Sequence, residues 1–329
     1  MNHNFIYLCE GEIGVCENQA PIFFHLSFVT LNSKIKAHIA LFLVALIYGA
    51  NYTIAKEVLD NEYIKPIGFI LMRVITGLIL FVFIHTLYVK EKVERKDFFR
   101  LILCGLFGVA INQTFFFSGL KLTTPINASL IMTTTPILVL IASSIIIGEK
   151  VTLRKILGIV VGCSGAVLLI LNGEKINFEK DQILGDLMIF INATSYGIYL
   201  VMVKSLMKKY NPITVVKWVF IFGTLFVFPF GYNELTEVQW HTFDLSIWLA
   251  IAYVLICTTF LAYLFNAYAL KTVNPSVVSI YIYLQPLLAT LIALIFAKDN
   301  LAMIKVLSGA LIFLGVYLVS SQRIKNVTN

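Results

Sequence analysis

The chain has 329 residues, of which 59% are apolar or aromatic and only 13% are charged. Soluble domains carry about 25% charged residues, so this composition, with a mean hydropathy of +0.88, excludes a soluble core with a polar shell. Several stretches of about twenty residues hold at most one charge, and this is the length that a helix needs to cross a bilayer. The composition therefore predicts an all-α integral membrane protein without room for a soluble catalytic domain.

The formal charge of +7 comes from 25 basic and 18 acidic residues. A basic chain can bind nucleic acid, but in a membrane protein excess lysine and arginine gather in cytoplasmic loops, and we expect no nucleic-acid partner. The five cysteines are scattered: Cys9, Cys16, Cys104, Cys163 and Cys257. Their spacing matches neither a metal site nor a disulfide framework, so no metal is predicted.

Apolar runs between charge clusters predict ten membrane spans. The first five cover 37–58, 66–89, 98–119, 125–147 and 153–171. After a polar stretch, five more cover 184–206, 212–231, 246–270, 275–297 and 303–321. Four prolines stand at the starts of spans, where the missing N–H costs no helical hydrogen bond: Pro66, Pro125, Pro212 and Pro275. Pro136 and Pro286 lie inside spans and are expected to kink them.

The basic residues of the predicted loops indicate the orientation. With the N-terminus inside, fifteen Lys and Arg fall on the cytoplasmic side and seven on the other, so both termini are predicted to be cytoplasmic, with 322–329 as a tail. Residues 1–36 form an N-terminal extension whose first thirty residues hold no Lys or Arg, unlike a signal peptide. An amphipathic arm is one interpretation; the favoured one is an over-extended start, with the natural start near Leu31.

An internal repeat decides the predicted architecture. Shifting residues 119–165 by 150 positions without a gap aligns ten identical residues. The aligned prolines and charges carry most weight, because Leu and Ile matches also arise from composition: Lys121/Lys271, Pro125/Pro275, Pro136/Pro286 and Lys155/Lys305. Each unit, 37–171 and 184–321, holds five spans, so the second unit enters the membrane the opposite way up. The predicted fold is ten transmembrane helices as two inverted five-helix repeats, which are typical of secondary transporters.

Short motifs recur in the two units. The first unit holds Tyr48-Gly49 with Lys56, Arg73, Ser118-Gly119-Leu120-Lys121 with Pro125, Ala128-Ser129 and Pro136, and Gly148-Glu149-Lys150 with Gly158 and Gly165. The second holds Tyr196-Gly197, Lys204, Pro275, Gln285-Pro286 and Gly315. Together these motifs resemble the EamA-type branch of the drug/metabolite transporter superfamily. Two departures are Lys298-Asp299, where the family usually shows a Gly-Glu pair, and Tyr48 in place of the common Trp. The resemblance implies the ten-helix fold and says little about the substrate, since this family moves diverse metabolites.

Arg73 is an ionisable residue inside a span, where a charge costs about 2.5 kcal/mol or more and usually faces a cavity or a partner. It lies seven residues beyond Pro66, about 10 Å along a helix, which is too deep for easy snorkelling. A guanidinium there suits a substrate carboxylate or phosphate. A structural arginine that caps carbonyls of a neighbouring broken helix is the alternative, and both stay open. No Asp or Glu lies mid-span, which lowers the expectation of autonomous proton coupling.

Uncharged polar residues gather inside the spans of both units and predict a pocket for a polar organic molecule. With Arg73, the candidate substrate-binding residues are Tyr48, Asn51, Tyr52, Asn112, Gln113, Thr134, Asn192, Tyr196, Tyr199, Trp218, Thr259, Tyr263, Tyr281 and Gln285. Asn192, Tyr196 and Tyr199 follow i, i+4, i+7 spacing and share one helix face. For Thr134 and Gln285, which lie close to prolines, satisfying the carbonyls freed by a kink is the alternative role.

The sequence therefore predicts a secondary transporter, an exporter or permease, of small organic metabolites. It would work by alternating access in the cytoplasmic (inner) membrane of a bacterium, with anions among the possible substrates. A membrane enzyme and a scaffold without flux are the other options. The chain holds no phosphate-binding loop and no His-Glu-x-x-His motif, so no catalytic residue and no cofactor is predicted. Gly158 and Gly162 form a small-xxx-small face that predicts close packing inside the bundle, with a homodimer interface left open.

Overall fold

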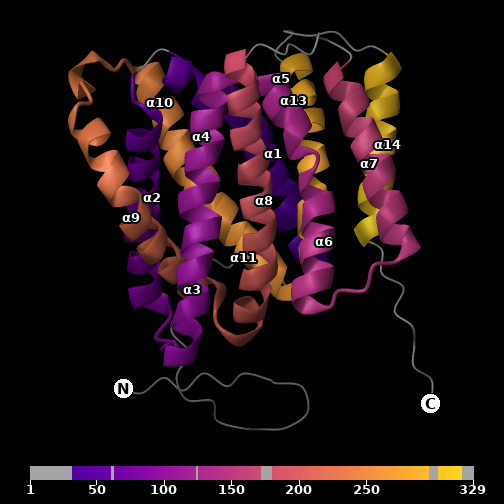
Figure 1. The fold of residues 1–329 in the computed structure, drawn as a ribbon, viewed down its shortest axis with the longest axis horizontal. Helices are drawn as coiled ribbons and strands as arrows, with labels where there is room; N and C mark the ends of the chain where they lie inside the picture. Colours follow the sequence, from indigo (N-terminus) through magenta and orange to yellow (C-terminus); the bar gives the residue numbers. More distant parts are fainter. Residues whose placement is uncertain (1–31, 61–62, 124, 172–179, 296–302, 321–329) are drawn as a thin grey trace, which may run out of the picture. The chain divides into compact units, whose positions relative to one another are not determined.

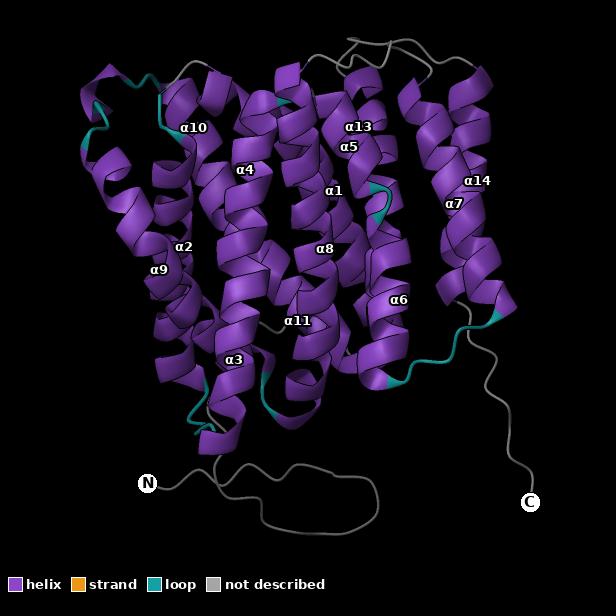
Figure 2. Ribbon diagram, in the orientation of Figure 1, coloured by secondary structure: helices purple, strands orange, loops and turns teal. Residues whose placement is uncertain are grey.

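Every element of the described chain is a helix, as the composition predicts (Figure 1, Figure 2). The structure is a computed structural model that describes residues 32–60, 63–123, 125–171, 180–295 and 303–320, and within these ranges it contains no strand. Of the predicted extension, residues 1–31 lie outside the described residues, as does the predicted tail 322–329.

The helices begin and end within five residues of the predicted span limits. The first half comprises α1 (Ser33–Asp60), α2 (Pro66–Tyr88), the 3-10 turn η1 (Arg95–Asp97), α3 (Phe98–Gly105), the π-helical η2 (Leu106–Ile111), α4 (Asn112–Leu122), α5 (Pro125–Met132), α6 (Thr135–Ile147) and α7 (Leu153–Leu171). The second half comprises α8 (Lys180–Lys209), α9 (Pro212–Thr236), η3 (Trp240–Thr242), α10 (Leu245–Tyr253), the π-helical η4 (Val254–Leu261), α11 (Ala262–Thr272), α12 (Pro275–Ile280), η5 (Tyr281–Tyr283), α13 (Leu284–Ile295) and α14 (Met303–Ser320).

Seven helical segments of the described chain are long and apolar enough to cross a membrane: Ser33–Asn51, Pro66–Tyr88, Arg95–Leu122, Asn127–Ile147, Ile183–Lys209, Pro212–Thr236 and Leu245–Thr272. Two shorter apolar helices are Pro275–Ala289 and Val306–Ser320. Large apolar side chains such as Ile145, Phe230 and Leu249 point outward, more than 60% exposed, whereas polar ones such as Gln113 and Asn192 are buried. This arrangement suits a chain whose outer surface faces lipid.

The kinks expected at the two mid-span prolines are confirmed as helix breaks. α5 ends at Met132, and α6 begins one residue before Pro136. The turn η5 separates α12 from α13, whose third residue is Pro286. Proline lacks an N–H and its ring clashes with the preceding turn, so a regular helix is interrupted there. A third proline, Pro229, was not among the predicted kinks, and α9 continues past it to Thr236.

The helices pack in pairs that relate the two halves of the chain. α7 packs along α14, and α2 packs along α9. α1 packs against α11 and α13, and the corresponding helix of the second half, α8, packs against α4 and α6. The π-helical segments correspond as well, because η2 directly precedes α4 and η4 directly precedes α11. Helices at the same place in the two halves therefore have the same kinds of neighbours.

Close approach of α7 and α14 depends on glycines. A Cβ added at Gly315 would lie 2.6 Å from the Cα of Gly162, and one added at Gly158 would lie 3.0 Å from the carbonyl oxygen of Gly315. Because these spaces admit only a hydrogen, the two backbones come into direct contact. The packing predicted for Gly158 and Gly162 inside the bundle is confirmed, since both face α14 of the same chain.

Ion pairs tie the loops together at both ends of the bundle. At one end, Lys209 lies 2.7 Å from the carboxylate of Glu94 and 2.6 Å from that of Asp97, which joins the segment after α2 to the end of α8. Loops 89–94, 148–152 and 210–211 lie at this end, along the lower edge of Figure 2, and we call it the basic face. At the opposite end Lys65 pairs with Glu237 at 2.6 Å.

Candidate functional site

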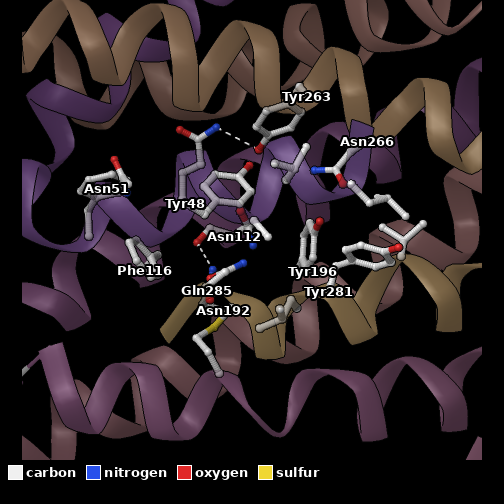
Figure 3. Close-up of a pocket in the computed structure, with 18 of the residues that line it drawn as sticks. Tyr48, Asn51, Asn112, Phe116, Asn192, Tyr196, Tyr263, Asn266, Tyr281 and Gln285 are labelled. Carbon is white, nitrogen blue, oxygen red and sulfur yellow. Dashed lines mark hydrogen bonds between the residues drawn. The ribbon is translucent and has the colours of Figure 1, made fainter. Parts of the chain in front are cut away.

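A small cavity of about 90 Å³ lies within the bundle, between helices of both halves (Figure 3). Polar residues are more than half of its lining: Tyr48, Asn51, Arg73, Asn112, Gln113, Asn192, Tyr196, Tyr263, Asn266, Tyr281 and Gln285. The rest of the lining is apolar: Leu41, Val44, Ala45, Phe116, Phe117, Met132, Val278 and Ile282. Among the described residues, no group of three His, Cys, Asp or Glu could hold a metal ion. The cavity fits a small polar solute.

Irregular backbone helps to build this cavity. A π-helix departs from the regular hydrogen-bonding pattern and often occurs at functional sites. In η2, the carbonyl of Gly108 accepts from the Tyr263 hydroxyl at 2.8 Å, and that of Phe107 accepts from the Ser195 hydroxyl at 2.6 Å. η2 is followed at once by Asn112 of the cavity wall. Side chains of the second half thus hold the irregular segment, which is tolerated at membrane depth where it lines a cavity.

Arg73 of α2 contributes the positive charge of the cavity wall and is only 4% exposed. Its Nε donates to the Thr259 hydroxyl at 2.9 Å, and one terminal nitrogen donates to Thr258 at 3.4 Å. The guanidinium carbon lies 4.5 Å from the centroid of the Phe117 ring. Both threonine hydroxyls donate in turn to the carbonyl of Val254 in η4. Since arginine has five N–H donors, these contacts leave part of the guanidinium for the cavity.

The charge of Arg73 is only partly compensated. Moving an ion out of water costs several kcal/mol even after the protein relaxes. The two threonine hydroxyls and the Phe117 ring compensate only part of this free energy. Within the part of the chain that the structure describes, no Asp or Glu lines the cavity. An anionic group on a bound solute would complete the site, because a carboxylate or phosphate matches the planar guanidinium.

Three residues of the cavity wall have buried amide oxygens without hydrogen-bond partners. The Gln113 Nε2 donates to the Tyr263 hydroxyl at 3.1 Å, and the Asn192 Nδ2 donates to the carbonyl of Asn112 at 2.7 Å, which fixes both amide orientations (Figure 3). The oxygens Oε1 of Gln113 and Oδ1 of Asn192, like Oδ1 of Asn51, are buried and accept no hydrogen bond. Such orphaned acceptors cost free energy unless a donor reaches them. The cavity therefore also suits hydrogen-bond donors of a solute.

The sequence model of the EamA-like transporter family matches residues 35–171 and 183–321. The chain belongs to the EamA-like transporter family. The two matched segments agree closely with the five-span units expected from the sequence, 37–171 and 184–321. Family membership identifies a multi-pass membrane protein of a transporter family.

Several relatives of this EamA protein carry transporter names. An uncharacterized transporter of Archaeoglobus fulgidus is 27% identical and covers 88% of this chain and 100% of its own. The uncharacterized transporter YyaM of Bacillus subtilis is 27% identical over 83% of this chain and 89% of its own. A WAT1-related protein of Arabidopsis thaliana is 24% identical over 87% and 85%. A crystal structure at 19% identity, covering 86% of this chain and 98% of that chain, has a TM-score of 0.71 and shows the same fold.

Ten of the fifteen residues predicted to bind substrate line the cavity of this EamA protein: Tyr48, Asn51, Arg73, Asn112, Gln113, Asn192, Tyr196, Tyr263, Tyr281 and Gln285. Thr259 lies behind the wall, where it holds Arg73. Thr134 lies outside the wall and donates its hydroxyl to the carbonyl of Ile131 at 2.7 Å, the alternative role near a kink. The side chain of Tyr52 lies outside the described residues.

Tyr199 and Trp218 also lie outside the cavity wall. Tyr199 packs against Gly108, where an added Cβ would come within 2.3 Å of the tyrosine ring. Trp218 stacks on Phe222 with ring centroids 5.8 Å apart and meets Phe98 edge-on at 4.8 Å. Both side chains therefore serve helix packing in this structure.

The candidate residues omitted one polar wall residue and all of the apolar wall. Asn266 lies three positions after Tyr263 and shares its helix face. Phe116 and Phe117 lie four positions after Asn112 and Gln113, so the same helical spacing identifies them. Met132 has a different signal: it is the last residue of α5, directly before the break that precedes Pro136.

Proposed function

We propose that this EamA protein is a secondary transporter that binds a small anionic metabolite in the central cavity and carries it by alternating access. The observation that carries the proposal is the buried guanidinium of Arg73, in a cavity lined by both halves of the chain. Transporters built from repeats bind substrate where the repeats meet, near the bilayer midplane. The family supports transport, and the cavity offers the binding site.

The proposed mechanism uses ten spans in two inverted units, 37–171 and 184–321. The seven long apolar segments, together with α7, α12 continued by α13, and α14, supply ten crossings. The equivalence of neighbours supports the inversion, because α2 pairs with α9 and α7 with α14, while α1 beside α11 mirrors α8 beside α4. Two such units can rock against each other around a central site and open it to each side in turn.

We assign the basic face to the cytoplasm of a bacterium and the chain to its cytoplasmic membrane, with both termini inside. Exposed lysines and arginines of the described loops at this face support the orientation: Lys90, Lys92, Arg95, Lys96 and Lys150. Short loops rich in Lys and Arg remain on the cytoplasmic side during insertion.

The chemistry of the cavity wall supports a particular class of substrate. Arg73 favours a substrate with one anionic group. The amide oxygens of Asn51, Gln113 and Asn192 favour a substrate with hydrogen-bond donors. A small amino or hydroxy acid combines both. A cavity of about 90 Å³ holds only a compact solute, well below the 300–1,000 Å³ that is usual for drug-sized ligands.

The first test is a ligand screen on the purified protein. Small carboxylates, amino acids, sugars, nucleosides and cationic drugs are added singly, and the melting temperature is recorded, because a solute that binds the native state raises it. Solutes that stabilise the protein are then tested for counterflow into proteoliposomes, with protein-free liposomes as the control. We expect small anionic or zwitterionic solutes to stabilise the protein and to exchange.

Three outcomes would count against the proposal. Stabilisation by cations alone would contradict the role of Arg73. Binding without counterflow would favour a scaffold. Chemical conversion of the solute would favour a membrane enzyme.

A further inference from the structure

A lipid-facing groove separates two consecutive helices, α6 and α7. Instead of packing along α6, α7 packs along α14, while α6 packs against α8 and α12; the separation is visible at the right of Figure 1. The groove between them has a volume of about 670 Å³ and is lined by Ile137, Leu140, Ile141, Ser144, Ile145, Val151, Ile156, Ile159, Val160, Cys163, Ser164 and Val167. Its walls are almost wholly hydrocarbon, and several of these side chains, such as Ile145 and Val160, are more than half exposed.

A basic pocket adjoins this groove at the basic face. It encloses about 1290 Å³ between the α6–α7 loop, the end of α8 and the end of α14. Five of its lining residues are basic, Lys150, Arg154, Lys155, Lys204 and Lys208, whereas Glu149 is acidic. The pocket therefore carries a formal excess of four positive charges from its lining side chains.

Lys155 and Lys204 are among the cations of the pocket that internal contacts hold. Lys155 pairs with Glu149 at 2.8 Å, and Lys204 donates to the carbonyls of Leu270 and Val273, which end α11. Lys150 and Lys208 are exposed and pair with no carboxylate of the described residues. The pocket thus keeps positive charge that its own acidic residue cannot neutralise.

The groove and the pocket share one wall. Gly148 ends α6 in a left-handed conformation, with φ of 64°, and the chain then crosses to α7 at Leu153. Along this loop Val151 lines the groove, whereas Lys150 and Thr152 line the pocket. The guanidinium carbon of Arg154 lies 5.9 Å from the ring centroid of Tyr317, an aromatic residue of the pocket edge. The apolar groove within the membrane thus ends beside the basic pocket at the membrane surface.

We propose that an anionic phospholipid occupies this place, with an acyl chain in the α6–α7 groove and its phosphate-bearing head group in the basic pocket. The charge complementarity favours an anionic over a zwitterionic head group, since basic pockets between membrane helices bind anionic lipid head groups. A soluble anion fills only the pocket and leaves the hydrocarbon groove unused. The lipid would link the α7–α14 pair to α6 and α8.

The test uses the full chain purified in detergent. Dioleoylphosphatidylglycerol, dioleoylphosphatidylcholine and inorganic phosphate are added separately, and bound lipid is measured by native mass spectrometry alongside the melting temperature. We expect phosphatidylglycerol to bind and to raise the melting temperature. Phosphatidylcholine and phosphate should bind more weakly and raise the melting temperature less. Raising the salt concentration should weaken phosphatidylglycerol binding and leave phosphatidylcholine binding unchanged. Equal binding of the two lipids overturns the proposal. The proposal is also overturned if inorganic phosphate raises the melting temperature as much as phosphatidylglycerol does.

Variants separate the two parts of the site. The double variant Lys150→Gln, Lys208→Gln should weaken phosphatidylglycerol binding about thirtyfold, while Lys90→Gln, Lys92→Gln on another loop of the same face should not. Ile141→Trp fills the groove and should exclude the lipid, and Ile79→Trp on the lipid-facing side of α2 is its control. Unchanged phosphatidylglycerol binding in the lysine variant overturns the proposal. If that variant fails to fold, the salt dependence of the unaltered protein decides the question.

Discussion

Gln113 and Tyr263 are 150 positions apart in the chain and share a hydrogen bond of 3.1 Å in the wall of the central cavity. The same spacing separates Pro125 from Pro275, so the bond joins corresponding positions of the internal repeat. Corresponding residues of two related units meet only close to the axis that relates the units. The bond therefore marks where the two proposed units come together, within the candidate substrate site.

The first prediction concerns this bond. Tyr263→Phe removes the hydroxyl that accepts from Gln113 and donates to the carbonyl of Gly108. We expect the free energy of unfolding to fall by about 1–3 kcal/mol, because buried partners lose their hydrogen bonds. A double-mutant cycle with Gln113→Leu should give a coupling of about 0.6 kcal/mol, the average for side-chain hydrogen bonds between membrane helices. Tyr232→Phe, at an exposed position of α9, is the control, and an equal loss there would contradict the prediction.

The second prediction concerns Arg73. Arg73→Gln removes the positive charge of the cavity wall and keeps a polar side chain. We expect kcat/KM for an anionic substrate to fall about tenfold to a hundredfold, since hydrogen bonds to charged groups contribute about 1.5–3 kcal/mol. Arg73→Lys keeps the charge without the planar guanidinium, so its kcat/KM should lie between the values of the unaltered protein and Arg73→Gln. Initial counterflow rates at several substrate concentrations measure the effect.

Two controls make this prediction specific. Arg95→Gln, at an exposed position of the basic face, should leave transport unchanged. The melting temperature of Arg73→Gln separates a binding defect from loss of the contacts with Thr258 and Thr259. A folded Arg73→Gln protein that transports anions as fast as the unaltered protein refutes the role of the guanidinium in substrate binding.

The sequence predicted the helices more completely than the cavity lining, because the forces that set helix limits act locally along the chain. A bilayer imposes a minimum apolar length on each span and a cost on each buried charge, and both act on a local stretch of chain. For that reason the span limits and the burial of Arg73 were predictable. The breaks before Pro136 and Pro286 were predictable as well, because the missing N–H of proline acts on its own helix.

The direction of individual side chains was less predictable, because neighbouring helices decide it. Tyr199 lies three residues after Tyr196, yet it packs against Gly108, where the missing side chain makes room for its ring. Trp218 stacks on Phe222 of its own helix and meets Phe98 through the packing of α9 on α3. An aromatic residue in an apolar span gives no sequence signal that distinguishes such packing from a cavity wall.

The third prediction concerns the contact between α7 and α14. Gly315→Ala adds a Cβ that would lie 2.6 Å from the Cα of Gly162, so the helix backbones must separate. Overpacking costs about 1–3 kcal/mol, and the upper part of this range applies here because the nearest atoms all belong to the backbone. This cost exceeds the gain in helix propensity of about 1 kcal/mol. The melting temperature should therefore fall. Gly197→Ala is the matched control, because its nearest neighbour would lie at 3.4 Å, an ordinary contact.

The fourth prediction concerns the pH dependence of the basic face. Hydrogen bonds from Lys209 and Lys96 lower the pKa of the Glu94 carboxyl below its ordinary value of 4.5. A carboxylate with a lowered pKa stabilises the folded state above pH 4.5, and this contribution is lost as the pH falls through the folded-state pKa. Glu94→Gln should therefore melt at a lower temperature than the unaltered protein at pH 7. The difference should shrink in salt, since all three side chains are exposed to solvent. On acidification it should begin to decrease near pH 4.5 and vanish once the pH lies below the folded-state pKa of Glu94. Lys90→Gln is the control, because it changes the net charge of the same loop without altering the contacts of Glu94 with Lys96 and Lys209. If the melting temperatures of Glu94→Gln and the unaltered protein still differ at low pH, the effect comes from packing rather than charge.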